Sequence, residues 1–146
     1  MPASWQGSEH QLYVIPDKIF GIRDPARADD RSRKFFCYER DRGSMPVVRS
    51  NLAQSSILRK LIGYGATYRA GLHATIYGLP NFRVLTEAPG RQRVENMIVD
   101  GYQHHLSHLY PPGLFLFADR HTLFSAEDFL EHHWLDGAGQ RHRLID

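Results

Sequence analysis

The chain has 146 residues, of which 42% are hydrophobic and 23% are charged, and its formal net charge is +2. This length and composition predict one globular domain over residues 1–146 and exclude a disordered or low-complexity chain. No apolar run reaches the roughly 18 residues needed to cross a membrane, and the opening segment Met1–Gln6 lacks a basic stretch followed by an apolar block. We therefore expect a cytoplasmic protein with no membrane partner.

Charge is spread unevenly along the chain. Residues 1–41 carry seven basic and seven acidic side chains, residues 42–86 carry six basic and none acidic, and residues 87–146 carry five basic and nine acidic. A basic middle segment of this kind is the asymmetry that a phosphate-binding surface needs. Cys37 is the single cysteine, which excludes an internal disulfide framework and a multi-cysteine zinc module.

The first third of the chain predicts strands. Leu12–Ile22 is typical of two short extended segments around Pro16 and Asp17, because proline lacks a backbone donor and suits a strand edge or start. The polar stretch Arg23–Lys34 predicts a connecting loop. Lys34–Arg40 then predicts the strongest strand of the first half, since it is apolar and rich in aromatic residues.

The remainder alternates helices and strands. Asn51 and Gln54 form a capping-box pattern that predicts a helix ending at Gly71, and Ser125 with Asp128 predicts a second cap and a short helix. The other expected elements are a strand at Phe82–Thr86, a helix from about Pro89 to Leu106, a central strand at Gly113–Ala118 and a terminal hairpin over about 131–146. Together they predict an α/β fold with a mixed sheet flanked by helices.

Two carboxylates follow the strongest predicted strand. Residues two apart on a strand point to the same face, so Glu39 and Asp41 should project side by side while Arg40 and Arg42 point the other way. Asp17 could join them as a third carboxylate. Clustered carboxylates are oxygen ligands suited to Mg²⁺ or Mn²⁺, and such a metal can polarise a phosphodiester and activate a water molecule.

Cations that could accompany such a site follow directly. A phosphodiester-cleaving site needs a positive charge beside the attacked phosphate, and Lys60 is the candidate on the helix after the acidic strand. Tyr64 lies four residues later and shares its helix face. Tyr64 is also a candidate for contact with DNA, and the candidates for contacts with the DNA backbone are Arg42, Arg49 and Arg59. A plain alternative is that the sequence from Glu39 to Gly43 is a charged strand end that enters a turn, and that the basic residues form a solvated helix face.

The chain resembles the replication-relaxation family of plasmid-borne proteins, whose C-terminal part is similar to the PD-(D/E)XK restriction-endonuclease-like fold. The resemblance is carried by Ile15–Asp17, Phe36–Pro46, Ser56–Tyr64 and Asn81–Thr86, and it spans roughly residues 12–120. It implies a role in plasmid replication, relaxation or mobilisation, contact with DNA or with a replication or mobilisation protein, and a restriction-endonuclease-like core. A nuclease that cuts both strands would suit a homodimer.

The family pattern maps onto Asp17 and Glu39 as metal ligands. Members usually carry a winged-helix region before this part, whereas only 11 residues precede the first expected strand here. The superfamily also places a lysine two residues after the strand glutamate, where this chain has Asp41. Lys60 on the following helix is the natural substitute, and a catalytically inactive module that binds DNA or a replication or transfer protein is the alternative.

Other motifs give weaker evidence for a functional site. His104 and His108 are four residues apart, a spacing that can hold zinc on a helix but that arises readily by chance among nine histidines. Cys37 has no histidine partner nearby in sequence, so we expect it to be a buried small residue and not a nucleophile. The glycines between Gly43 and Gly71 do not form a phosphate-binding loop pattern.

Overall fold

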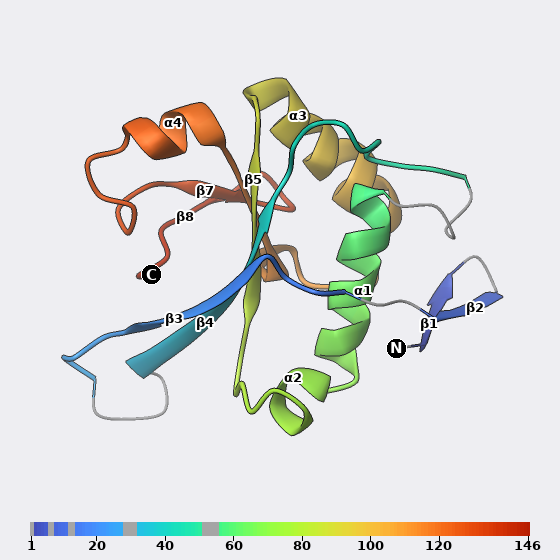
Figure 1. Cartoon of the computed structure of the whole chain (residues 1–146), viewed down its shortest axis with the longest axis horizontal. Helices are drawn as coiled ribbons and strands as arrows, with labels where there is room; N and C mark the ends of the chain where they lie inside the picture. Colours follow the sequence, from blue (N-terminus) through green and yellow to red (C-terminus); the bar gives the residue numbers. More distant parts are fainter. Residues whose placement is uncertain (1, 6–7, 12–13, 28–31, 51–55) are drawn as a thin grey trace.

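A computed structural model describes residues 2–5, 8–11, 14–27, 32–50 and 56–146 (Figure 1). Its main element is a six-stranded sheet in the order β3-β4-β5-β6-β7-β8. A separate two-stranded antiparallel hairpin is formed by β1 (Pro2–Trp5) and β2 (Ser8–Gln11). The strands of the main sheet are β3 (Lys18–Arg23), β4 (Arg33–Arg40), β5 (Arg83–Ala88), β6 (Phe115–Asp119), β7 (Trp134–Asp136) and β8 (Arg141–His142).

The sheet is mixed, as predicted. Strands β4, β5 and β6 run parallel, while β3 and the terminal pair β7 and β8 are antiparallel to their neighbours. Parallel neighbours need a crossover connection, and these connections supply α1 (Ile57–Arg69), α2 (Leu72–Thr75), α3 (Arg91–Asn96) and the π-helix η2 (Met97–Gln103). The predicted central strand and terminal hairpin are both present.

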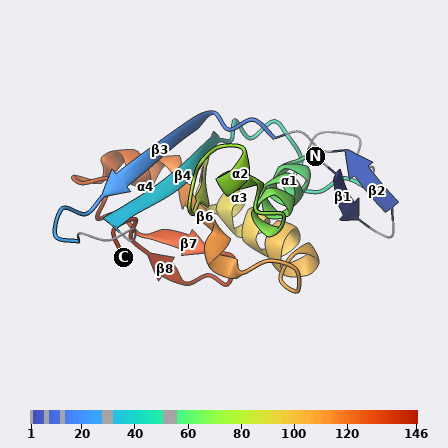
Figure 2. The same ribbon diagram turned by 90° about the horizontal axis from the view of Figure 1, so that it is seen from below.

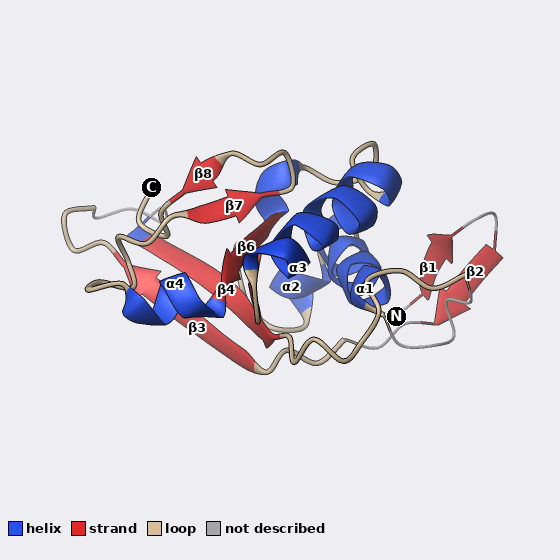
Figure 3. Ribbon diagram, turned by 90° about the horizontal axis from the view of Figure 1, so that it is seen from above, coloured by secondary structure: helices blue, strands red, loops and turns tan. Residues whose placement is uncertain are grey.

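Helices cover both faces of the sheet (Figures 2 and 3). The larger core lies between one face and the helices α1, α3 and η2, and it includes Leu61, Val84, Met97 and Phe117. The smaller core lies on the other face, where Leu123 of α4 (Arg120–Ser125) packs with sheet residues and the C-terminal segment. Each parallel strand is therefore buried on both sides, as its continuous apolar sequence predicts.

Helix boundaries differ from the expected ones at two places. α1 begins at Ile57, because the Ser56 side chain accepts a hydrogen bond from the Arg59 backbone N–H at 3.0 Å; the predicted capping box at 51–54 lies outside the described residues. The predicted helix start at Ser125 is wrong, since Ser125 ends α4. Asp119 caps that helix instead, by accepting from the Thr122 backbone N–H.

The other predicted elements hold with small shifts. The helix stop at Gly71 is confirmed, because α1 ends at Arg69 and Gly71 adopts a φ of 68°. The predicted helix from Pro89 is split into α3 and the π-helix η2. Of the two expected extended segments, the second is present as β3. Residues 12 and 13 of the first lie outside the described residues, and residues 14–16 form no strand. None of the described helices has the length and apolarity required to cross a lipid bilayer.

Candidate functional site

Glu39 and Asp41 lie where the parallel strands β4 and β5 end. Both are buried, with 5% and 6% of their surface exposed. Glu39 is paired in register with Thr86 of β5, and all three residues line one cavity on the face covered by α1 and α3. The two carboxylates therefore share a face of the sheet, as the strand period predicts.

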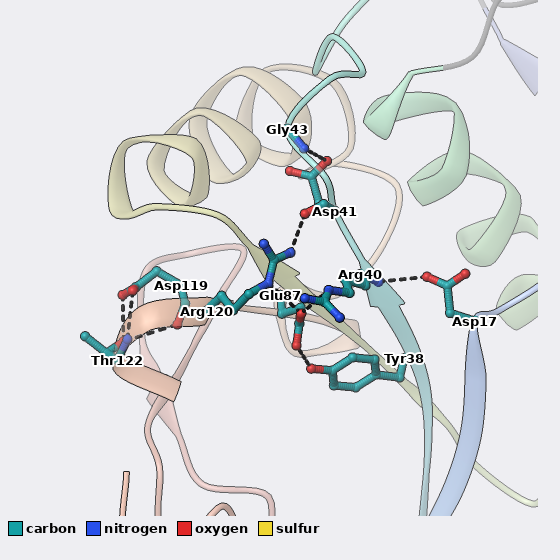
Figure 4. A network of polar contacts seen from close by, with 9 residues as sticks. All are labelled: Asp17, Tyr38, Arg40, Asp41, Gly43, Glu87, Asp119, Arg120 and Thr122. Carbon is teal, nitrogen blue, oxygen red and sulfur yellow. Dashed lines mark hydrogen bonds and ion pairs between the residues drawn. The ribbon is translucent and has the colours of Figure 1, made fainter. Parts of the chain in front are cut away.

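The alternation holds for Arg40 but not for Arg42. Arg40 pairs with Glu87 on the opposite face, with 3.1 Å between Arg40 Nε and Glu87 Oε1 (Figure 4). The strand ends at Arg40, and the chain then turns through Gly43, whose φ is 80°. Arg42 consequently lines the same cavity as Glu39 instead of pointing away, because the two-residue period applies only within the strand.

Glu39 is held by helix α1. Lys60 Nζ lies 3.1 Å from Glu39 Oε2, and the Tyr64 hydroxyl donates a hydrogen bond to Glu39 Oε1. Lys60 and Tyr64 are one helical turn apart, so the predicted helix face meets the predicted strand carboxylate. Burial raises the pKa of Glu39 and the nearby Asp17 charge adds to this, while the contacts to Tyr64 and Lys60 oppose it.

Asp41 is held by helix α3. Arg93 donates to both carboxylate oxygens of Asp41, at 2.8 Å from Nε and 3.2 Å from Nη2. The Gly43 backbone N–H also donates to Asp41 Oδ1, at 3.1 Å. This bidentate pairing is among the strongest ways to fix a carboxylate. Asp41 and Glu39 thus share a face but have different partners.

Asp17 lies beside the end of β4, just before β3. Its Oδ2 accepts a hydrogen bond from the Arg40 backbone N–H at 2.9 Å (Figure 4). This contact arises because β3 and β4 are antiparallel and Lys18 is in register with Tyr38, which brings the residue before β3 next to Glu39. The carboxylate is exposed and lines the cavity with Glu39.

A cavity of about 380 Å³ collects these groups. It is formed by the end of β4, the turn after it, β5 and the first two turns of α1. Its polar lining contains Asp17, Glu39, Asp41, Arg42, Lys60 and Tyr64, together with Arg40, Ser44 and Thr86. Six of the eight residues predicted for the site from sequence therefore meet in one cavity, although they span 48 positions of the chain.

The other two predicted residues are not part of the cavity lining. Arg49 is exposed in the segment before α1. Arg59 lies on α1 and is partly buried, and its Nε has no hydrogen-bond partner among the described residues. Helical geometry explains the separation, because adjacent helix positions such as Arg59 and Lys60 point about 100° apart.

Metal-binding capacity at the cavity rests on two nearby carboxylates, Asp17 and Glu39. Within the described ranges, no group of three or more His, Cys, Asp and Glu side chains is arranged to hold a metal ion. Asp41 is committed to Arg93, and its role as a third ligand stays a prediction. Mg²⁺ commonly binds through one or two carboxylates together with substrate phosphates, so Asp17 and Glu39 have a suitable donor chemistry.

Sequence reasoning missed Arg93 and the network around Glu87. Glu87 is 1% exposed and accepts hydrogen bonds from Arg120 Nε at 2.8 Å and from the Tyr38 hydroxyl. Arg120 also donates to the Asp41 carbonyl at 2.5 Å (Figure 4). Arg93 and Arg120 come from the helices that follow β5 and β6. The predicted order of strands places the starts of both helices near the end of β4, so a sequence signal for these two arginines was present.

The weaker candidates have ordinary surroundings. Burial raises the pKa of Cys37 to about 11, which keeps its thiol protonated at neutral pH. His104 and His108 are exposed near the end of the helix that contains η2. Gly63 and Gly65 permit close packing: a Cβ on Gly65 would lie 2.3 Å from Cε2 of Tyr110.

Comparison of the chain with protein-family models, with curated proteins and with solved structures gives no match. The functional argument therefore rests on the geometry of the cavity.

Proposed function

We propose that the chain binds DNA and that its cavity is a divalent-metal-dependent nuclease site on a restriction-endonuclease-like core, in a protein of the plasmid replication-relaxation type. The observation that carries this proposal is the contact between Lys60 and Glu39 in the cavity that Asp17 also lines. Two carboxylates can hold a divalent metal and an amine can stabilise charge that develops on a phosphate, so this set of groups is suited to hydrolysis of a phosphodiester.

The order of elements supports the same proposal. Asp17 precedes the first strand of an antiparallel pair, Glu39 lies in the second strand, one residue before its end at Arg40, and a helix leads to a parallel third strand. The PD-(D/E)XK resemblance implies Asp17 and Glu39 as metal ligands with Lys60 on the following helix as the substitute lysine, and this order of elements is compatible with it. The distance of 3.1 Å between Lys60 Nζ and Glu39 Oε2 shows that a helical lysine can occupy the vicinity of the strand glutamate.

Asp17 and Glu39 would hold the metal. When bound, Mg²⁺ or Mn²⁺ supplies a Lewis acid for the phosphodiester and lowers the pKa of a bound water. The protein's own contribution is orientation: the Arg40 backbone N–H holds one oxygen of Asp17, and the Tyr64 hydroxyl holds Oε1 of Glu39. Each carboxylate keeps lone pairs for a further ligand.

Lys60 and Tyr64 have different roles. The Lys60 side chain is 40% exposed, so its ammonium can move from Glu39 to a phosphate that enters the cavity and stabilise charge there. Burial and the Glu39 charge raise the pKa of Tyr64, which keeps its proton on the hydroxyl. Tyr64 thus remains a donor to Glu39, while Lys60 is the group able to change partner.

DNA would approach from the open side of the cavity. Arg42 is exposed on the turn after β4 and lines the cavity, so it is placed to contact a phosphate next to the attacked one. Contacts of this kind position the nucleic acid and make affinity fall with salt, but they carry no sequence preference. Arg49 and Arg59 would extend the basic surface outside the cavity.

A second candidate function is a catalytically inactive module that binds DNA or a replication or transfer protein. The observation in its favour is the bidentate pair between Asp41 and Arg93 at the position where the superfamily has its lysine. In this alternative the acidic groups form a structural ion network, and the cavity contributes to binding without cleavage.

The deciding experiment compares wild type with Glu39→Gln. Calorimetric titration with Mn²⁺ should show binding to wild type and none to the variant, and only wild type should relax or linearise supercoiled plasmid in the presence of the metal. Glu95→Gln is the matched control, because Glu95 is half exposed on α3 and pairs only with Arg91 among the described residues. Absence of both metal binding and cleavage in wild type would overturn the nuclease and favour the inactive module.

A further inference from the structure

A second cavity lies at the opposite edge of the sheet, where the parallel strands begin. Its volume is about 500 Å³, which is within the range of small-molecule sites. Residues at the starts of β4 and β5 and in the segments before β4 and β6 form its walls. The first cavity is lined by residues at the ends of β4 and β5 and the second by residues at their starts, so the two cavities occupy opposite ends of the same parallel strands.

Four basic side chains line this second cavity. Arg33 and Lys34 come from the start of β4, Arg83 comes from the start of β5, and Arg27 comes from the loop after β3. Within the described ranges, neither Arg33 nor Arg83 forms an ion pair with a carboxylate, and Arg27 makes a 3.6 Å surface pair with Asp24. The cavity is therefore lined by more cations than these pairs neutralise.

The acidic residue of the lining, Asp146, contacts Arg143 and Lys34 and, among the described residues, forms no ion pair with Arg33 or Arg83. The carboxylate of Asp146 is engaged by Arg143, through Nε at 3.0 Å and the backbone N–H at 2.9 Å. Lys34 donates to the main-chain oxygen of Asp146, the last residue of the sequence, and so already has a partner in the cavity. The pKa of Lys34 is lowered by burial first and then by the charges of Arg83 and Arg27, against the opposing effect of Asp146 and Asp24.

The walls of the cavity are held in place. The Asn81 side chain accepts from the Phe35 backbone N–H and donates to the Arg33 carbonyl, each at 3.3 Å. This pair of bonds ties the start of β4 to the segment before β5. The rings of Phe35 and Tyr68 add aromatic surface beside the arginines, and Tyr68 is 40% exposed.

We propose that this cavity binds a phosphate-bearing ligand of nucleotide size, either a free mononucleotide or one nucleotide of a nucleic acid strand. Arginines present paired donors that match phosphate oxygens, and an aromatic ring next to them can stack on a base. The phosphate would bind to the basic side chains that line the cavity, and the base would lie against the aromatic wall. The inference does not depend on cleavage in the other cavity.

The test is calorimetric titration of the full chain with AMP, adenosine and inorganic phosphate, with a fluorescent single-stranded oligonucleotide followed by anisotropy. AMP should saturate one site, adenosine should not bind measurably, and phosphate should compete. Arg83→Gln and Arg33→Gln should each weaken AMP binding about tenfold, as expected for the loss of one charged hydrogen bond. Arg141→Gln is the matched control, because Arg141 is exposed on β8 outside the cavity lining and should change affinity less than about twofold.

These titrations distinguish a free mononucleotide from a nucleic acid strand as the ligand, and they distinguish binding in the second cavity from binding in the first. An oligonucleotide that binds much more tightly than AMP and loses affinity in Arg33→Gln and Arg83→Gln identifies a strand as the ligand; equal affinities identify the mononucleotide. Titration of wild type in the presence of EDTA, which removes the divalent metal that the first cavity would need, should leave AMP binding unchanged, so a failed nuclease proposal would not affect this result. The inference is overturned if AMP does not bind, if adenosine binds as well as AMP, or if both cavity variants behave like Arg141→Gln.

Discussion

Glu39 and Glu87 are buried carboxylates on neighbouring strands, but their surroundings differ. Glu87 is in register with Arg40 and faces the side of the sheet that α4 covers, where Arg40, Arg120 and Tyr38 surround it (Figure 4). Two guanidinium groups compensate one carboxylate there. The ion network is satisfied, and it joins β4, β5 and α4.

Glu39 is less fully compensated. It has one ammonium partner, Lys60, whose side chain is 40% exposed, and one neutral donor, Tyr64. A second carboxylate, Asp17, lies close enough to raise its pKa further. A buried charge left in this state costs stability, and such groups gather at functional sites. The comparison indicates that Glu87 stabilises the fold, whereas Glu39 is placed for a role in the cavity.

The largest expected difference between the Glu39 and Glu87 networks is in the rate of plasmid cleavage. Lys60→Met removes the cation that can reach a phosphate in the cavity, so metal-dependent plasmid cleavage should fall at least about 100-fold, the scale of losing one charge-stabilising group. Arg120→Met is the counterpart in the Glu87 network and should retain cleavage at a temperature where it stays folded. Plasmid relaxation rates measure both. Equal loss in the two variants would remove the distinction between the networks.

The second effect is on stability, for which we expect the Glu87 network to matter more than the Glu39 network. Glu87→Gln leaves Arg40 and Arg120 without a carboxylate partner, so the free energy of unfolding should drop by about 3 kcal/mol. Glu39→Gln should cost far less, because it removes an under-compensated charge. Urea denaturation followed by circular dichroism measures both values. A smaller loss for Glu87→Gln than for Glu39→Gln would contradict the assignment of Glu87 to the fold.

The part of the site that the sequence could predict is the part that depends on local geometry. Strand alternation brings Glu39 and Asp41 to one face, and helical spacing brings Lys60 and Tyr64 to one face. Both periods are fixed by the backbone alone. The meeting of these two faces followed from the expected order of strand and helix.

What the sequence could not predict depends on long-range pairing. Arg93 reaches Asp41 across 52 positions, which requires β5 to lie beside β4 in a particular register. The helix start was misassigned for a different reason, since Asp119 with Thr122 and Ser125 with Asp128 both have capping chemistry. The predicted strand at Gly113–Ala118 ends directly before Asp119, so the signal that favours Asp119 was present in the sequence.

Helix α1 offers a smaller test of how the Glu39 network is positioned. Gly65 lets α1 approach Tyr110, and a Cβ there would lie 2.3 Å from the ring. Gly65→Ala should destabilise the protein by about 1–3 kcal/mol through overpacking, and it should also reduce cleavage, because α1 carries Lys60 and Tyr64. Thermal unfolding and plasmid relaxation measure the two effects. Gly113→Ala is the control, since a Cβ at Gly113 meets nothing within 4 Å; equal effects of both substitutions would exclude the packing explanation.

The smallest effect is a pH dependence that isolates the charge on Glu39. The folded state raises the pKa of Glu39 above its ordinary value of 4.5, so in that pH range the folded protein binds more protons at this group than the unfolded chain does. Stability from Glu39 is therefore present at low pH and is lost as the pH rises through the folded pKa. Glu39→Gln lacks this loss, so the Tm of the variant minus that of wild type should increase from about pH 4.5 towards neutrality. Taking the difference cancels the other titrating groups. A difference that decreases with pH would mean that the ionised Glu39 stabilises the fold, in which case Glu39 would belong with Glu87 as a structural ion pair.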